Sequence, residues 1–200
     1  MGCQTTCQSH FRGEIEHCSS TEGSNSPQSK RRSTVPSTPI NSSYFSPDIS
    51  EFLKCLHRFD VKYMIVGGEA VIFYGHARYT GDVDFFYSDE DKNAKVLFDA
   101  LSVFWEGNIP EINNFAELQV PGQILQFGRP PNRIDLLNQI DGVHFDKAWP
   151  HRKKVELEAE PSLIPINYLD LENLIKNKEA SARPKDLDDL KYLKSSKKSD

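Results

Sequence analysis

Asp82 and Asp84 interrupt the apolar segment 82–87 (DVDFFY) at positions where a buried strand normally carries Val or Ile. Side chains two residues apart on a strand point to the same face, so both carboxylates project together while Val83 and Phe85 face the core. Carboxylates this close repel each other, and one of them takes up a proton unless a cation lies between them. The pair therefore predicts a divalent cation site on a strand.

A glycine pair upstream predicts what this cation accompanies. The apolar segment 61–66 (VKYMIV) ends at Gly67 and Gly68, and a short helix is expected over 69–74. Glycines at such a junction let the backbone approach a ligand closely, and the first turn of a helix points free N–H groups at an anion. Mg²⁺ binds carboxylate and phosphate oxygens together. We therefore expect a nucleoside triphosphate at this helix start, with its metal ions on the neighbouring strand.

Asp135, in the apolar segment RIDLL, is the candidate for a third carboxylate. Nucleotidyl transfer uses two metal ions, one for the attacking hydroxyl and one for the leaving pyrophosphate, and such a site needs a further acidic ligand. Asp135 is expected to complete the site on the hydroxyl side and to assist its deprotonation. The alternative is a structural ion pair between Asp135 and Arg133 or another basic residue.

The remaining patterns indicate one α/β or α+β domain, a small sheet with helices packed on it. Residues 1–45 are rich in Ser, Thr, Gln, Asn and Pro and are expected to be disordered, 46–194 to form the domain, and 195–200 to be a frayed tail. The expected elements in chain order are a helix at 46–59, a strand at 61–66, a helix at 69–74, a strand at 82–87, a helix from 88 or 89 to about 101, strands at 123–128, 132–140 and 153–159, and helices at 168–180 and 185–193.

The composition says more about the cellular compartment of the protein than about its function. The net charge of −5 gives no global basic field, although a local patch could still hold RNA. No apolar run reaches the ~18 residues of a membrane span, and the N-terminus lacks the apolar stretch of a secretory signal. The cysteines agree with a reducing compartment, so we expect a cytoplasmic protein without a membrane partner.

Two short patterns in the N-terminal tail suggest functions other than a disordered segment: a zinc site and a lipid attachment site. Cys3, Cys7 and Cys18 lie near His10 and His17, but their spacing fits zinc pairs poorly, which favours a disordered tail over a zinc site. The first residues, MGCQTT, match the N-myristoylation pattern, with Cys3 as a palmitoylation candidate in a eukaryotic host.

Val66-Gly67-Gly68, a spacer of thirteen residues and Asp82-Val83-Asp84-Phe85 together resemble the signature of the DNA polymerase β-like nucleotidyltransferase superfamily. Within it, GHARYTGDVDFF resembles the AbiEii-like and MenT-like nucleotidyltransferase toxins of prokaryotic toxin–antitoxin systems. In these an Arg and a Thr commonly precede the first aspartate, here Arg78 and Thr80.

The C-terminal segment LIKNKEASARPKDLDDLKYL resembles the Lys-x4-Arg-x2-Asp-x2-Asp region of the same family. Lys178, Arg183, Asp186 and Asp189 carry that pattern, and the last of these is expected to be a surface or buffering charge. The resemblance covers residues from about 50 to about 194.

This resemblance implies a nucleotidyltransferase fold, a mixed sheet with flanking helices and a C-terminal helical segment. It also implies transfer of a nucleoside monophosphate from an NTP to a hydroxyl with two Mg²⁺ ions, or Mn²⁺, the acceptor being in some toxins the 3′ end of tRNA. A cognate antitoxin or regulator is a further implied partner. The implied site residues are Asp82, Asp84 and Asp135 for catalysis and metal, and Gly67, Gly68, Arg78, Thr80, Lys178, Arg183 and Asp186 for the nucleotide.

Two other functions remain open at this point. Gly68 stands where the family often has Ser, and the C-terminal region is brief, which favours a nucleotide-binding regulatory or antitoxin-like module without turnover. The third function is a non-enzymatic interaction protein in which the acidic residues form an ion-paired core.

Overall fold

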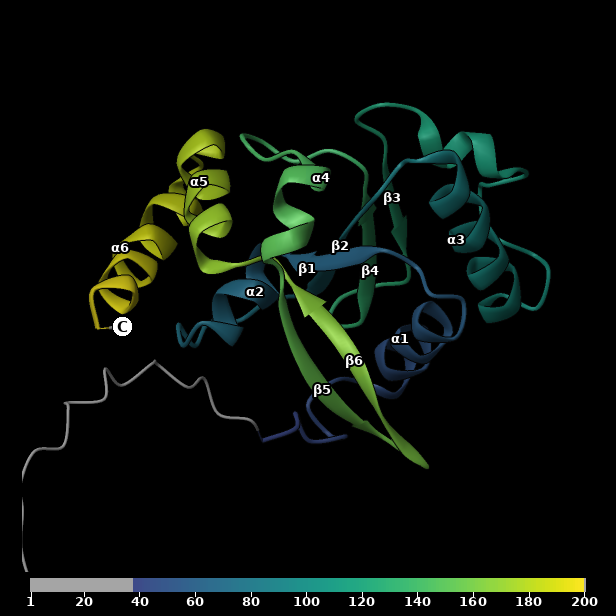
Figure 1. The fold of residues 1–200 in the computed structure, drawn as a ribbon, viewed down its shortest axis with the longest axis horizontal. Coiled ribbons are helices and arrows are strands. Elements are labelled where there is room, and N and C mark those ends of the chain that lie inside the picture. The colour runs from purple at the N-terminus through teal and green to yellow at the C-terminus, as the bar shows by residue number, and fades with distance from the viewer. Residues whose placement is uncertain (1–37, 200) are drawn as a thin grey trace, which may run out of the picture. The chain divides into compact units, whose positions relative to one another are not determined.

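The computed structural model describes residues 38–199, with side chains through residue 195. One six-stranded sheet in the order β3-β4-β2-β1-β6-β5 forms the centre of this part of the chain (Figure 1). The strands are β1 (Tyr63–Val66), β2 (Asp82–Tyr87), β3 (Ile124–Phe127), β4 (Arg133–Leu137), β5 (Lys153–Ala159) and β6 (Ser162–Tyr168). The helices are α1 (Pro47–Arg58), α2 (Gly67–Phe73), α3 (Asp91–Phe104), α4 (Phe145–Ala148), α5 (Leu171–Ser181) and α6 (Pro184–Ser199), with 3-10 turns η1 (Phe115–Gln119) and η2 (Trp149–His151).

The sheet is mixed. β1 pairs antiparallel with β2 and parallel with β6, and β2 pairs parallel with β4. β3 and β5 are antiparallel partners of β4 and β6 at the two edges. The predicted class, a mixed α/β domain with helices on a sheet, is confirmed, while the nucleotidyltransferase fold in particular stays a prediction.

Helices α1 and α3 form the aromatic side of the core. Ser46 caps α1 by accepting a hydrogen bond from the Ile49 amide, and Pro47 occupies the first turn, as the sequence predicts. The apolar stripe of α1 then carries Phe52 into edge-to-face contact with Phe85 of β2 at 5.1 Å and with Phe104 of α3 at 5.2 Å between ring centroids. These contacts hold β2 from the face opposite to its aspartates.

Helices α5 and α6 pack against each other beside α2, on the other side of the view in Figure 1. The Asp170 side chain caps α5, Ala182 ends it in a left-handed conformation, and Pro184 begins α6. The break predicted around 183–184 is confirmed. The backbone of α6 continues to Ser199 instead of fraying after 194, because extending an established helix costs little.

The domain begins earlier than the predicted boundary at residue 46. The Ile40 amide and carbonyl bond to Glu156 and Glu158 of β5, and Phe45 is buried in the core. Disorder is therefore the wrong prediction for residues 38–45. Isolated apolar residues such as Ile40 and Phe45 give no helical or strand periodicity in a polar segment. Their contacts with the domain therefore could not be predicted from the sequence.

β6 and the short helices α4, η1 and η2 were not predicted. Pro165 argues against a strand at 162–168, since proline cannot donate to a sheet ladder. β6 tolerates it because β1 reaches β6 only at Ile65 and Tyr168, so Pro165 lies where β6 has β5 as its neighbour. The predicted helix at 69–74 starts two residues earlier, at Gly67.

The predicted disorder of 1–37, the zinc and lipidation patterns and Cys3, Cys7 and Cys18 lie outside the described residues. Cys55 is a buried free thiol in α1. No helix among the described residues has both the length and the apolar character needed to cross a membrane.

Phe45→Ala is expected to lower the free energy of unfolding by about 3 kcal/mol, because it removes a buried ring and leaves a cavity. Urea denaturation of the full chain measures this, with Val103→Ala as the control, because Val103 on α3 is 44% exposed. Equal and small effects of both substitutions would show that the segment before α1 is not part of the core.

Candidate functional site

The three aspartates lie on one face of two adjacent strands. β2 and β4 run parallel, and their register places Asp84 beside Asp135 and Asp82 beside Arg133. Asp135 is only 4% exposed, whereas Asp82 and Asp84 are half-buried. Alternation along β2 therefore places Asp82 and Asp84 on one face, as their spacing predicts, and the register with β4 adds Asp135.

Gly67 allows the backbone to pass directly over Asp84. Val66 pairs with Asp84 across β1 and β2, and Gly67 follows with a φ of +62°. A Cβ at position 67 would lie 1.8 Å from Asp84 Oδ2, closer than any real contact. Only glycine fits this turn, both for its conformation and for the approach.

Gly68 makes room for the loop that leads into β2. A Cβ there would lie 2.8 Å from both Arg78 Nη2 and Thr80 Oγ1. Thr80 donates its hydroxyl to Asp82 Oδ1 at 3.0 Å, and Arg78 Nε lies 3.2 Å from Asp189 Oδ1. Thr80 therefore orients a site carboxylate, and Arg78 ties the loop to α6.

Arg133 joins two of the three carboxylates. Its Nε and Nη2 donate to Asp135 Oδ1 and Oδ2 at 2.7 and 2.8 Å, and Nη2 also donates to Asp82 Oδ2 at 2.5 Å. The hydrogen bonds to Asp135 and the charges of the three aspartates raise the pKa of the guanidinium. The ion pair considered from the sequence is thus present, and it includes Asp82 as well.

Asp84 is the carboxylate that Arg133 leaves out. Within residues 38–195 no hydrogen bond or ion pair reaches its oxygens. Burial and the charges of Asp82 and Asp135 raise its pKa to about 6, against the weaker opposing effect of Lys178 and Arg133. A half-buried carboxylate among like charges is the group that gains most from a bound cation.

Lys178 and the acidic residues of α6 form a buried cluster. Lys178 Nζ lies 2.6 Å from Asp186 Oδ1 and 3.1 Å from Asp189 Oδ2. Burial alone would raise the pKa of Asp186, but hydrogen bonds from Lys178 and Ser181 hold it below its usual value. Asp189 is 1% exposed, so its expected role as a surface charge is wrong: it is the buried partner of Lys178 and Arg78.

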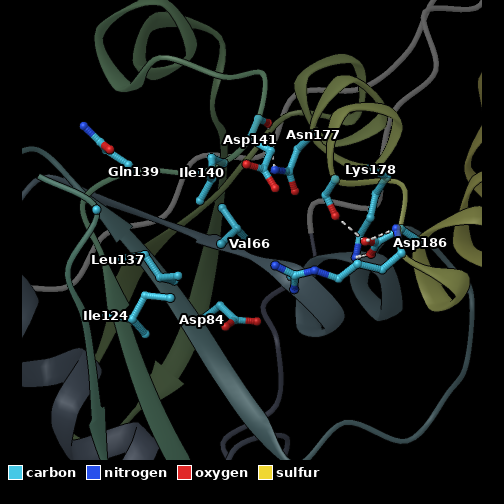
Figure 2. A pocket seen from close by; sticks show the side chains of 14 residues that line it. Val66, Asp84, Ile124, Leu137, Gln139, Ile140, Asp141, Asn177, Lys178 and Asp186 are labelled. Atoms are coloured by element: carbon cyan, nitrogen blue, oxygen red, sulfur yellow. Dashed lines mark hydrogen bonds and ion pairs between the residues drawn. The ribbon is translucent and has the colours of Figure 1, made fainter.

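Two adjoining cavities meet at Asp84. The larger, of about 820 Å³, is lined by the complete set of site residues expected from the sequence: Gly67, Gly68, Arg78, Thr80, Asp82, Asp84, Asp135, Lys178, Arg183 and Asp186. The smaller, of about 360 Å³, lies between Asp84 and the loop and helix that carry Asp141 and Asn177 (Figure 2). Arg183 and Lys178 line both cavities.

Arg133 and Gln126 are site residues that sequence reasoning missed as such. Gln126 of β3 lies beside Asp135 and donates to its Oδ2 at 2.9 Å. The available signal was the strand alternation that places residues 133 and 135 on one face. Gln126 could not be assigned without knowing that β3 pairs with β4.

The three aspartates offer a metal only oxygen ligands, and Arg133 occupies oxygens of Asp82 and Asp135. Among residues 38–195 no three His, Cys, Asp or Glu side chains stand in a ready-made metal cluster. Carboxylate oxygens nevertheless suit Mg²⁺, and Asp84 faces the large cavity without a partner. The residues fit the metal if Arg133 releases Asp82 or Asp135.

Compared with models of known protein families and with curated proteins, the chain matches none of them. The geometry of the cavity is therefore the ground on which a function can be argued.

Gly67→Ala is expected to cost about 2 kcal/mol or more of unfolding free energy, since it adds left-handed strain to an overlap with Asp84. Gly107→Ala is the matched control, because Gly107 also has a positive φ of +85° but nothing within 4 Å of the added Cβ. In the Asp84→Ala background the cost at position 67 should fall markedly but stay above that of Gly107→Ala, because the Cβ of residue 84 remains 3.2 Å from the added Cβ. An unchanged cost in the double mutant would contradict the close approach.

Asp84→Asn is expected to stabilise the metal-free protein by about 2 kcal/mol at pH 7, because the raised pKa reflects the cost of ionising Asp84 in the fold. The contribution of Asp84 to stability, read as the difference between wild type and the variant, should fall as pH rises from about 4 to about 6, since the unfolded state releases this proton near 3.8 and the folded state near 6. The variant should lose that slope in EDTA-containing buffers. Asp99→Asn, exposed on α3, should keep it.

Proposed function

We propose that the chain is a Mg²⁺-dependent nucleotidyltransferase that moves a nucleoside monophosphate from an NTP to a hydroxyl acceptor. The observation that supports this proposal is the single cavity lined by three carboxylates, the glycine turn and several cations. Resemblance to the nucleotidyltransferase signature suggested the residues, and their convergence from α2, β2, β4, α5 and α6 is what that chemistry requires.

The acidic wall of the cavity suits the metal and the reacting oxygens. Asp82, Asp84 and Asp135 would hold Mg²⁺, which supplies charge neutralisation for the phosphates and acidifies the acceptor hydroxyl. Asp135, the most buried of the three, would assist removal of the hydroxyl proton once Arg133 has released it. The acceptor oxygen then forms its bond to the α-phosphorus while the bond from the α-phosphorus to the pyrophosphate oxygen breaks.

The opposite wall suits the triphosphate. Arg183 and Lys185 line the large cavity at the start of α6, and neither side chain is in an ion pair among the described residues. They can neutralise the pyrophosphate that leaves. Lys178 is expected from the family resemblance to do this, but it is already held by two aspartates. Its proposed task is therefore to fix α6 against α5 and to place Arg183 at the cavity.

A non-enzymatic module is the second candidate, and Arg133 is the observation that favours it. A guanidinium that pairs with Asp82 and Asp135 neutralises part of the acidic core without any metal, and leaves Asp84 alone without a partner among the described residues. Gly68 also offers no hydroxyl to the phosphates, which suits a nucleotide-binding regulator without turnover. The proposal also includes a tRNA acceptor, an antitoxin partner and a cytoplasmic location. These three rest on the sequence and not on the geometry of the cavity.

The decisive measurement incubates the full chain with each α-³²P-labelled NTP, Mg²⁺ or Mn²⁺, and total tRNA or small hydroxyl acceptors. Wild type should transfer label, and Asp82→Asn or Asp84→Asn should reduce transfer by about 100-fold or more, as expected for loss of charge stabilisation in the transition state. Asp99→Asn should leave transfer unchanged. NTP binding without transfer would select the regulatory module, and no NTP binding would select the ion-paired core.

A further inference from the structure

The guanidinium of Arg133 occupies the carboxylate oxygens that a metal would need. Three of the four oxygen atoms of Asp82 and Asp135 accept hydrogen bonds from it, and the fourth, Asp82 Oδ1, accepts from Thr80. Gln126 adds a second donor to Asp135 Oδ2. A metal ion that bridges these aspartates and an arginine that bridges them therefore compete for the same oxygen atoms and for the space between the two carboxylates.

One arginine does not neutralise this site. Asp82, Asp84 and Asp135 carry three negative charges against the single charge of Arg133, and Asp84 has no partner among the described residues. The arginine thus closes two carboxylates and leaves the third facing the cavity. The site keeps an attraction for further positive charge while its bridging oxygens are blocked.

Arg133 can move to another anion without leaving the cavity. Its side chain is 27% exposed whereas that of Asp135 is 6% exposed, so the guanidinium lies on the cavity side of the pair. It lines the large cavity together with Arg183 and Lys185. The planar fork of a guanidinium binds phosphate oxygens as well as carboxylate oxygens, often with two hydrogen bonds.

We propose that Arg133 is an exchangeable internal cation: it holds Asp82 and Asp135 while the site lacks nucleotide, and it transfers to the triphosphate when the nucleotide arrives with its metal. Metal alone then binds weakly, and metal and triphosphate bind together. This inference rests on the proposed function for the identity of the ligand, but it concerns binding and not turnover.

The test uses two probes that need no knowledge of the base or the acceptor. Mn²⁺ binding to the full chain without nucleotide is measured by electron paramagnetic resonance, and binding of inorganic tripolyphosphate at saturating Mg²⁺ by calorimetry. Arg133→Gln should bind Mn²⁺ about tenfold tighter than wild type and tripolyphosphate about tenfold weaker, within the ~5–150-fold range of typical coupling between ligands. A residue with a purely structural role would not move the two affinities in opposite directions.

Two further variants complete the design. Arg129→Gln, an exposed arginine outside both cavities, should match wild type with both probes. Arg133→Lys keeps the charge but lacks the planar fork that holds Asp135 with two hydrogen bonds and Asp82 with a third, so it should gain Mn²⁺ affinity while keeping most of the tripolyphosphate affinity. Should Arg133→Gln fail to fold, the gain in Mn²⁺ affinity of Arg133→Lys over wild type carries the test, and its absence overturns the inference.

Equal Mn²⁺ affinity in wild type and the Arg133 variants, or no Mn²⁺ binding by any of them, overturns the inference. Unchanged tripolyphosphate affinity in Arg133→Gln does so as well. The opposite shifts without any label transfer by wild type would uphold the cation exchange and reject the nucleotidyltransferase. Label transfer without the shifts would do the reverse.

Discussion

Mutual repulsion between carboxylates on neighbouring strands is the constraint that organises this molecule. Placing Asp82 and Asp84 on β2 and Asp135 on β4 sets three negative charges on one patch of sheet, which costs folding energy unless cations compensate it. Arg133 compensates two of them. The cost of the third, Asp84, is offset by apolar packing on the opposite face of β2, where Phe85 is buried against Phe52. Such local frustration is typical of sites built for a ligand and not for stability.

In the buried cluster of Lys178 and the acidic residues of α6, the negative charges are compensated by basic side chains. Lys178 lies between Asp186 and Asp189, and Arg78 reaches Asp189 from the loop before β2. Each buried charge there has a partner, so the cluster fixes α5, α6 and the loop relative to one another. The site therefore combines a cluster in which each charge has an oppositely charged neighbour and a group of three aspartates in which Asp84 has none among the described residues.

How much the sequence could predict depended on how local the determinants are. The Asp-x-Asp alternation, the glycine stop and the strand at 82–87 are short-range patterns, and the structure has β2 at those bounds. The strand order and the pairing of Gln126 with Asp135 depend on contacts between distant segments, which no local period encodes. Pro165 concealed β6 because the usual rule against proline in strands assumes two neighbours along the whole strand.

The partners of charged residues were the hardest part to predict. Composition and spacing identify Lys178 and Asp189 as charged, but not that α5 and α6 fold back on each other and bury them together. Similarly, Arg133 was visible as a possible partner of Asp135, while its reach to Asp82 required the parallel register of β2 and β4. Side-chain identity predicted the chemistry, and topology decided which groups neutralise each other.

The segment before α1 has a mechanical consequence for the glycine turn. Tyr44 donates its hydroxyl to Glu69, two residues after Gly67, and Tyr168 donates to the same oxygen from β6. Burial raises the pKa of Glu69, so these two phenols are what make its position tolerable. Because the two are coupled, breaking the hydrogen bond between Tyr44 and Glu69 should destabilise the first turn of α2. Conversely, a ligand that stabilises that turn should strengthen the binding of the segment before α1 to the domain.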